Sequence, residues 1–181
     1  MKNSVKVLLS MFAVFVFLML LAGSSESDTS SSTDTNQGTE KKSAFSIGDD
    51  VTVGDLAYRV ESSKEASSIQ SGNEFIDDLT TTGKFVIIDV TVQNNDKESR
   101  YVDGAMFKLL DKDGAEYSST SEADMLINDG TGFFLEKINP KMSRRGKVAF
   151  EVPADATNLK LQVSSGLGWS GGDYEEISLG N

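Results

Sequence analysis

Acidic residues that could hold a calcium ion occur together at one place in the chain. Asp111 and Asp113 are separated by one residue, and Glu116 follows shortly after them. Carboxylate oxygens at short spacing are the hard ligands that Ca²⁺ prefers, although an EF-hand would need further ligands and a bidentate Glu at its twelfth position. Asp113-Gly114 is also typical of tight turns, so a turn without metal is the competing interpretation. We expect no other metal site and no cofactor.

Enzymatic chemistry has few candidate residues in this sequence. The chain has no His and no Cys, which removes the usual general base near neutral pH, thiolate nucleophiles, disulfides and Cys-based metal sites. Two carboxylates can hydrolyse glycosides without His, but none of the 28 acidic residues stands out as a pair. A Ser–Lys dyad could supply a nucleophile and a base without His, but no Ser of the chain lies in a motif that would form the structured turn such a nucleophile needs. We therefore expect a protein that is not an enzyme and has no catalytic residues.

The only Trp of the chain, Trp169, lies in the glycine-rich segment 166–172. An exposed Trp on a loop is a common anchor for a sugar or a protein partner. The alternative is that Trp169 folds back over the open end of the domain. Trp169 is therefore our candidate partner-binding residue.

One basic cluster stands out on an acidic chain. Arg144 and Arg145 lie close to Lys141 and Lys147, whereas the chain as a whole carries a net charge of −11. The cluster could contact an anionic envelope polymer, or it could be strand-edge charge that deters pairing with another sheet. The acidic surface repels phosphate backbones, so we expect no nucleic acid partner.

The elements that would position these residues are organised around a strand at residues 84–94. Its apolar residues alternate at the period of a β-strand, and a second strand at residues 144–153 has a similar pattern. The inward residues expected to form the core are Val86, Ile88, Val90, Val92, Val148, Phe150 and Val152. The other face of the first strand carries Phe85, Ile87, Asp89 and Thr91 and is half apolar.

Short β-rich segments separated by turn residues fill the rest of the domain. We expect further strands at residues 45–53, 56–61, 101–102, 106–110, 115–117, 132–135, 159–163 and 174–179. Residues 62–83 are polar without a clear period, which predicts a long surface loop with a helical turn. Ser121 and Asp124 predict a capped helix through Ile127. The pattern predicts an all-β protein, an antiparallel sandwich of about seven to nine strands.

The first residues have the layout of an export signal. Lys2 and Lys6 precede an apolar run at residues 7–22, which at about 1.5 Å per residue is too short for a stable membrane span. Residues 21–24 are similar to the Leu-Ala-Gly-Cys of bacterial lipoprotein signals. Ser24 stands at the Cys position and carries no thiol, so this chain should not be lipidated. Two explanations for Ser24 remain open: a Cys has been replaced in this version of the sequence, or this family member has lost its lipid anchor.

These patterns predict three segments. Residues 1–24 would be the lipoprotein-like signal peptide, and residues 25–43 a disordered linker rich in Ser and Thr. Residues 44–181 would form the sandwich domain. The linker is either a spacer that holds the domain away from a membrane or cell wall, or a processing remnant without a role.

Four motifs in this order resemble a known family. They are Phe45 to Asp49, Gly83 to Asn94, Phe107 to Gly114 and Gly146 to Pro153. Together they resemble domain of unknown function 4352, a telokin-like, immunoglobulin-fold family of exported bacterial proteins, many of them lipoproteins with a polar tether. The resemblance implies an immunoglobulin-like β-sandwich and an extracytoplasmic location, and it transfers no catalytic residues. Ser24 departs from the lipoprotein pattern.

We therefore expect an exported, non-catalytic, immunoglobulin-like module that binds a protein or an envelope polymer. It would be secreted or lie at the outer face of the bacterial cell membrane, with membrane contact only through a retained N-terminal segment. The first alternative is a structural spacer domain without its own ligand. A more distant alternative is a hydrolase that uses two carboxylates.

Overall fold

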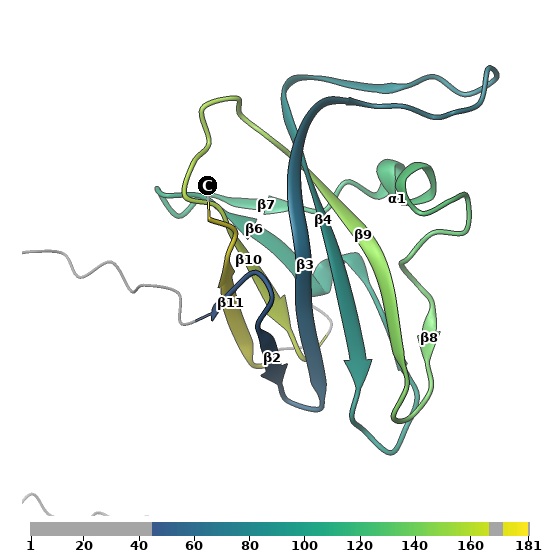
Figure 1. The fold of residues 1–181 in the computed structure, drawn as a ribbon, viewed down its shortest axis with the longest axis vertical. Helices are drawn as coiled ribbons and strands as arrows, with labels where there is room; N and C mark the ends of the chain where they lie inside the picture. Colours follow the sequence, from purple (N-terminus) through teal and green to yellow (C-terminus); the bar gives the residue numbers. More distant parts are fainter. Residues whose placement is uncertain (1–44, 167–171, 181) are drawn as a thin grey trace, which may run out of the picture. The chain divides into compact units, whose positions relative to one another are not determined.

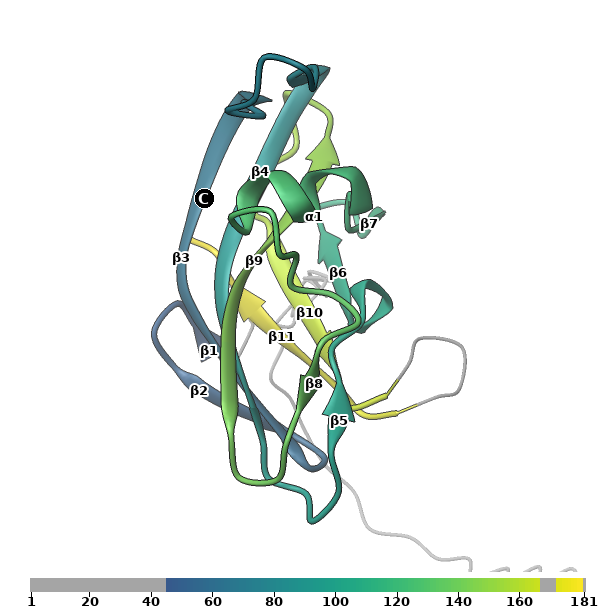
Figure 2. The same ribbon diagram turned by 90° about the vertical axis from the view of Figure 1, so that its right-hand side faces the viewer.

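The computed structural model describes residues 45–166 and 172–180, which form a β-sandwich with one short α-helix and one 3-10 turn (Figures 1 and 2). The strands are β1 (Phe45–Ser46), β2 (Asp50–Val53), β3 (Leu56–Ile69), β4 (Leu79–Asn94), β5 (Arg100–Tyr101), β6 (Phe107–Leu110), β7 (Glu116–Ser118), β8 (Lys137–Ile138), β9 (Ser143–Val152), β10 (Lys160–Ser164) and β11 (Tyr174–Ser178). The helix α1 spans Ser121–Ile127, and the turn η1 spans Gly104–Met106.

Two main sheets face each other. One has the order β1-β11-β10-β6-β7 and the other β2-β3-β4-β9, while β5 and β8 form a small third sheet. All pairs among the described residues are antiparallel except β1 with β11. The prediction of an all-β sandwich is confirmed. The described part holds more strands than expected, because residues 45–53 form two strands, β1 and β2, and because the two-residue β8 was not predicted.

The main core lies between the two large sheets. The seven residues expected to point inward are at most 3% exposed and belong to one apolar cluster. Tyr58 meets Phe107 edge-on, with ring centroids 5.9 Å apart, and its hydroxyl donates to the carbonyl of Ser164 at 2.5 Å. Burial raises the pKa of Tyr58 above its usual value. The hydrogen bond satisfies the one polar atom that Tyr58 brings into the core.

A second apolar cluster lies on the other face of β4, beneath α1. It contains Phe85, Ile87, Ala123 and Ala149, with Leu126 packed against it. The half-apolar outer face of β4 therefore has a physical reason. Phe85 and Ile87 pack in the cluster beneath α1, whereas Asp89 and Thr91 lie beyond it, half-buried, and bind polar neighbours.

The prediction of a surface loop at residues 62–83 is wrong. β3 continues to Ile69 and β4 begins at Leu79, so only residues 70–78 connect the two strands. Bulges interrupt the pairing between Val60 and Ser62 and between Ala66 and Ser68, and such bulges bend a strand. Much of this hairpin meets solvent on both faces, so its sequence lacks the alternation of a half-buried strand.

The prediction of a strand at residues 132–135 is also wrong. Phe133 is fully buried, but its amide donates to Oδ1 of Asp124 at 2.8 Å, and the amide of Phe134 donates to Oδ2 at 3.2 Å. Asp124 therefore binds this loop instead of capping the helix. The helix itself is present as predicted, with Thr120 at its N-cap and no side-chain cap hydrogen bond.

Candidate functional site

The hairpin formed by residues 62–83 is the most prominent feature that a partner could reach, and we call it the arm. Figure 1 shows β3 and β4 bending away from the sandwich at the end of this hairpin. Among the described residues, β2 pairs with β3 only from Leu56 to Arg59, and β9 pairs with β4 only from Lys84 onwards. The arm is thus a two-stranded extension of the sheet, and its outer half has no third strand.

The end of the arm, residues 71–78, has an ordered structure and is called the arm tip. The amide of Ser71 donates to Oδ1 of Asp78 at 2.8 Å, and the Ser71 hydroxyl donates to the carbonyl of Ile76 at 2.6 Å. The amide of Phe75 donates to Oδ1 of Asn73 at 3.0 Å. These hydrogen bonds between side chains and backbone hold the arm tip in one conformation, as a tight turn would. The backbone that carries Phe75 is therefore ordered.

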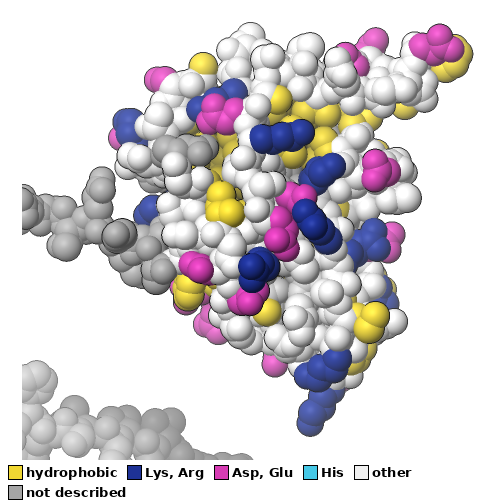
Figure 3. All heavy atoms as spheres, viewed as in Figure 1, with side chains coloured by type: hydrophobic (Ala, Val, Ile, Leu, Met, Phe, Trp, Pro, Cys, Tyr) yellow, Lys and Arg dark blue, Asp and Glu magenta, His cyan; other side chains and the backbone are white. Residues whose placement is uncertain are grey.

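Apolar and acidic side chains share the arm tip. Phe75 is 88% exposed and Ile76 is 50% exposed. Glu74, Asp77 and Asp78 are exposed beside them, and Figure 3 shows acidic and apolar side chains together at this end. An exposed aromatic ring on a pre-ordered turn is suited to insertion into a pocket of another molecule, and the surrounding acids favour a basic rim on that pocket.

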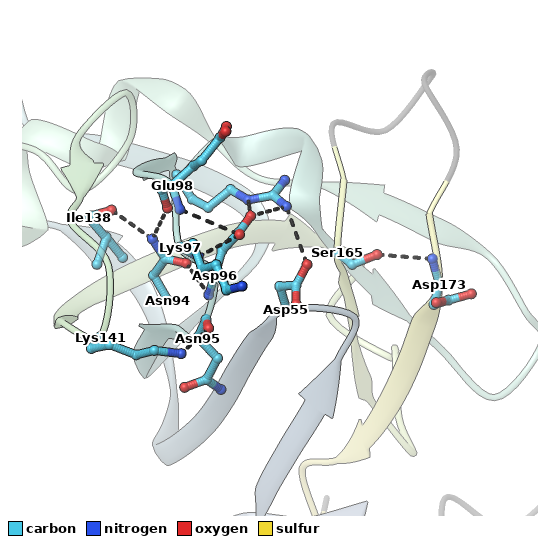
Figure 4. Close-up of polar contacts among 11 residues, drawn as sticks. Asp55, Asn94, Asn95, Asp96, Lys97, Glu98, Ile138, Lys141, Ser165 and Asp173 are labelled. Carbon is cyan, nitrogen blue, oxygen red and sulfur yellow. Dashed lines mark hydrogen bonds and ion pairs between the residues drawn. The ribbon is translucent and has the colours of Figure 1, made fainter.

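The candidate residue Trp169 lies outside the described residues, but both ends of its loop are described. The amide of Ser165 donates to the carbonyl of Asp173 at 3.1 Å, and the amide of Asp173 donates to the Ser165 hydroxyl at 3.1 Å. The turn between β2 and β3 lies against this pair, since a Cβ on Gly54 would come within 2.8 Å of the Ser165 side chain. Figure 4 shows the pair beside Asp55 of the same turn.

A buried Asn organises the neighbouring loops at this end of the sandwich. Nδ2 of Asn94 donates to the carbonyls of Glu98 at 2.7 Å and Ile138 at 3.0 Å, and its Oδ1 accepts from the amide of Asp96 at 2.9 Å (Figure 4). Arg100 binds the Asp96 carboxylate at 2.5 Å. Hydrogen bonds from the Lys97 amide and from Arg100 hold the pKa of Asp96 below its usual value. This network stabilises the loops and leaves little of their polar surface free.

The arm tip and the ends of the Trp169 loop lie at opposite ends of the sandwich. β3 runs from the turn at Gly54 to the arm, and its 14 residues at about 3.3 Å each separate the two ends by about 40 Å. From the sequence, Trp169 is predicted to bind a partner, and residues 62–83 are predicted only as a surface loop. In the structure the arm tip and the ends of the Trp169 loop lie at different ends of β3.

The calcium candidates lie in the β6–β7 hairpin, which closes at the predicted turn. The Asp111 carboxylate accepts hydrogen bonds from the amides of Asp113 and Ala115 and from the Tyr117 hydroxyl, at 2.8–2.9 Å. These contacts hold the pKa of Asp111 below its usual value and raise that of Tyr117. The Asp113 and Glu116 carboxylates instead bind lysines. Within residues 45–166 and 172–180, no group of three or more acidic residues could hold a metal ion.

The basic cluster lies on β9, the outer strand of its sheet. Arg145 binds Asp89 through two hydrogen bonds of 2.8 Å, and Arg144 lies 3.4 Å from the Glu136 carboxylate. Arg145, and to a smaller extent the charge of Lys147, hold the pKa of Asp89 below its usual value. Acidic and basic side chains are interspersed over this face in Figure 3. The local pairing favours strand-edge charge over a site for an anionic polymer.

Several residues that shape these surfaces were missed in the sequence. Phe75 fell within the segment predicted as a loop, and the run Asn73 to Asp78 offered only a turn signal. Asn94 and Asp124 are polar and at least 91% buried, and no local pattern distinguishes them from surface residues. No helix in the described part of the chain is long and apolar enough to cross a membrane.

Comparisons with known proteins identify relatives of this chain. A family model described as domain of unknown function DUF4352 matches residues 45–175. The yjhA protein of Bacillus subtilis is 14% identical over 74% of this chain and 98% of its own, with a TM-score of 0.56. A functionally unknown protein of Listeria monocytogenes is 15% identical over 74% of this chain and 82% of its own, with a TM-score of 0.54.

A third similar structure belongs to a longer protein. The ycdA protein of Bacillus subtilis, described provisionally as a lipoprotein, is 17% identical over 75% of this chain and 40% of its own, with a TM-score of 0.51. At identities this low, the structural similarity shows a common fold and does not indicate what this chain binds. A search of curated protein sequences finds no significant match.

Proposed function

The chain belongs to the family described as domain of unknown function DUF4352, and from this premise we propose that it is an exported, non-catalytic module that binds a partner protein through its arm tip. Export is supported by Lys2, Lys6 and the apolar run at residues 7–22. The polar segment at residues 25–43 would then act as a tether between the signal and the sandwich. The description of ycdA as a lipoprotein agrees with such a location.

One observation carries the binding role: Phe75 is 88% exposed at the end of the arm, on a backbone fixed by hydrogen bonds. Exposing a Phe ring to water forgoes about 1.5–3 kcal/mol that burial would provide. A partner pocket would recover this free energy, and the ordered tip reduces the entropy lost on binding.

The partner expected at this site is a protein with an apolar pocket rimmed by Lys or Arg. Glu74, Asp77 and Asp78 surround the apolar residues of the tip, so an anionic lipid surface or an anionic wall polymer would be repelled. Complementary charge around a central aromatic anchor is typical of specific protein interfaces.

Retention on isolated cell envelopes tests this function. Envelopes from a host strain that lacks the protein are mixed with the full chain or with its Phe75→Ser variant. Loss of an aromatic anchor worth about 2 kcal/mol would lower retention about 30-fold. Met142→Ser is the matched control, since Met142 is also exposed, at 59%, but lies in the loop next to Asn94 at the opposite end.

Treating the envelopes with protease separates the possible partners. Loss of retention after protease supports a protein partner, whereas full retention would contradict it and indicate a polymer. If Phe75→Ser is retained as well as the unchanged chain, the arm tip is not the binding site. Absence of any retention would favour the spacer alternative.

Trp169 lies outside the described residues, so its role in binding a partner remains a prediction. Trp169→Ala in the same assay should reduce retention with unchanged folding if this residue also contacts a partner. Because the ends of its loop lie far from the arm tip, a combined loss with Phe75→Ser should be additive.

A further inference from the structure

Two neighbouring depressions on the outer face of the five-stranded sheet share lining residues, and together we call them the groove. The larger, of about 460 Å³, lies beside η1 and is lined by Phe134 and Leu135. The smaller, of about 240 Å³, is lined by Gln162 and Tyr174. Ala105 and Lys108 line both, so the two depressions meet there.

The groove runs across the strands rather than along an edge. Gln162 of β10 lies opposite Lys108 of β6, and Lys108 lies opposite Ser118 of β7. The backbone groups of β6 are already paired on both sides, with β10 and β7. An extended peptide laid across β10 and β6 would therefore find no free backbone groups there to pair with, and recognition at that point must come from side chains.

The lining of the groove carries little net charge. Nζ of Lys108 lies 2.7 Å from the Glu116 carboxylate. The carboxylate of Asp103, the remaining charged group among the described lining residues, accepts a hydrogen bond from the Ala105 amide at 2.8 Å. An anionic ligand would find no unpaired cation there and would meet a protein with a net charge of −11.

Apolar surfaces lie at both ends of the groove, and uncharged polar groups lie between them. Tyr174 is 56% exposed at one end, and Leu135 is 73% exposed at the other, beside Phe134. Gln162 and the hydroxyl of Ser118 lie between these ends. Aromatic faces pack against the CH faces of sugar rings, and amide and hydroxyl groups bind their hydroxyls.

Leu135 is held in an unusual backbone conformation at the edge of the groove. Its φ is 60°, in the left-handed region that Leu rarely adopts. Its amide donates to the carbonyl of Val102 at 2.7 Å, and the amide of Val102 donates to the carbonyl of Glu136 at 3.0 Å. These bonds to Val102, the residue after β5, hold the backbone at Leu135 while its side chain stays exposed.

We propose that this groove binds a neutral glycan chain of several sugar units. The ligand follows from the combination of an elongated shape, apolar ends, uncharged polar groups and paired charges. The groove uses residues of β6, β7, β10, β11 and η1, none of which belongs to the arm, so the proposal is independent of a binding role for the arm tip.

Calorimetric titration of the full chain tests the proposal. The probes are neutral hexasaccharides of glucose, of mannose and of N-acetylglucosamine, with polyglycerol phosphate as the anionic comparison. At least one neutral hexasaccharide should bind, with little dependence on salt. Tyr174→Ala should weaken that binding about tenfold. Ala105→Trp, which fills the middle of the groove, should abolish it.

Phe75→Ser serves as the matched control and should bind the hexasaccharide as the unchanged chain does. Ala105 and Tyr174 are both exposed, so thermal unfolding should show that the two groove variants remain folded. Three results would each overturn the proposal: no neutral hexasaccharide binds, Ala105→Trp binds normally, or polyglycerol phosphate binds more tightly than every neutral probe.

Discussion

Asn94 is a buried polar residue that replaces backbone pairing where the sheet ends. Its side chain donates to the carbonyls of Glu98 and Ile138, and its backbone amide donates to the carbonyl of Met142. Asp124 acts in the same way for the amides of Phe133 and Phe134. At the scale of single residues, these two side chains determine the course of loops that no strand supports.

Replacing Asn94 with Ala should lower the stability of the domain. The substitution leaves two carbonyls without their donor, one of them in the interior, which should lower the free energy of unfolding by about 2–4 kcal/mol. Urea denaturation measures this change. Asn95→Ala is the control and should lie within about 0.5 kcal/mol of the unchanged protein. Equal losses for both variants would contradict the role of Asn94.

The ion pair between Asp89 and Arg145 should affect stability in acid. Because the pKa of Asp89 is lower in the folded protein than in the unfolded chain, its contribution is present above about pH 4 and is lost as the pH falls through the folded pKa. Arg145 is 60% exposed, so the contribution should stay below about 1 kcal/mol.

NMR titration of the Asp89 carboxyl group tests this directly. In Arg145→Ala the pKa of Asp89 should rise, because the hydrogen bonds to the guanidinium are lost. The Asp89→Asn variant should lose less stability below about pH 4 than the unchanged chain. A pKa of Asp89 that is the same with and without Arg145 would show that the pair has no effect in solution.

At the scale of elements, β9 depends on close packing by the loop that precedes β8. Phe133 lies directly over Gly146, where an added Cβ would come within 2.2 Å of the ring. On the other side of this loop, Asn128 exchanges hydrogen bonds with the backbone of Lys147 and thereby occupies part of the open edge of β9. The edge is thus occupied by the Asn128 side chain at Lys147. Further along β9, Ser119 forms a backbone bridge with Phe150, and the Thr120 amide donates to the carbonyl of Ala149 at 2.7 Å.

Gly146→Ala should therefore destabilise the domain. Moving the Phe133 ring aside disturbs a fully buried contact, so we expect a loss of about 1–3 kcal/mol in the free energy of unfolding. In a Phe133→Leu background the smaller side chain leaves room, and Gly146→Ala should cost less than it does alone. Chemical denaturation of the four variants measures this coupling, and strict additivity would contradict the contact.

Strands with one buried and one exposed face could be predicted from the sequence, because their apolar residues alternate. Segments whose two faces are equally exposed or equally buried were missed. Val86 to Val92 alternate because one face of β4 is core, and the β6–β7 hairpin closes at Gly114, whose φ of 79° suits Gly. The outer half of the arm is mostly exposed apart from Ile69 and Leu79, so its sequence lacks the alternation of a half-buried strand and resembles a loop. Phe133 and Phe134 belong to a loop and pack against the main core, and a short apolar run of this kind cannot be distinguished from a strand by its sequence.

The candidate surfaces were less predictable than the fold. The groove depends on the register between β10, β6 and β7, which no single segment encodes. The exposure of Phe75 depends on how far the arm extends beyond its neighbours. Trp169 and the calcium candidates stood out by residue type alone, and residue type does not tell whether a carboxylate such as that of Asp111 is already occupied by its own turn.

At the scale of the described unit, the arm tip is separated from the other two surfaces. The groove adjoins the ends of the Trp169 loop, because Ser164 and Tyr174 line it and are next to Ser165 and Asp173. The arm tip lies at one end of β3, the ends of the Trp169 loop lie at the other, and the groove lies on the outer face of the five-stranded sheet. A module with this arrangement could hold a glycan and a protein partner at the same time. Sandwich strands keep these surfaces at fixed distances because the main core is continuous between the sheets.

Photo-cross-linking in living cells tests the central claim most directly. A photoreactive amino acid is placed at position 75 of the full chain or, as the control, at position 142, which is also exposed. We predict one discrete protein adduct from position 75, its loss when Asp77 and Asp78 are replaced by Lys, and no such adduct from position 142. No adduct from position 75, or the same adducts from both positions, would contradict a binding role for the arm tip.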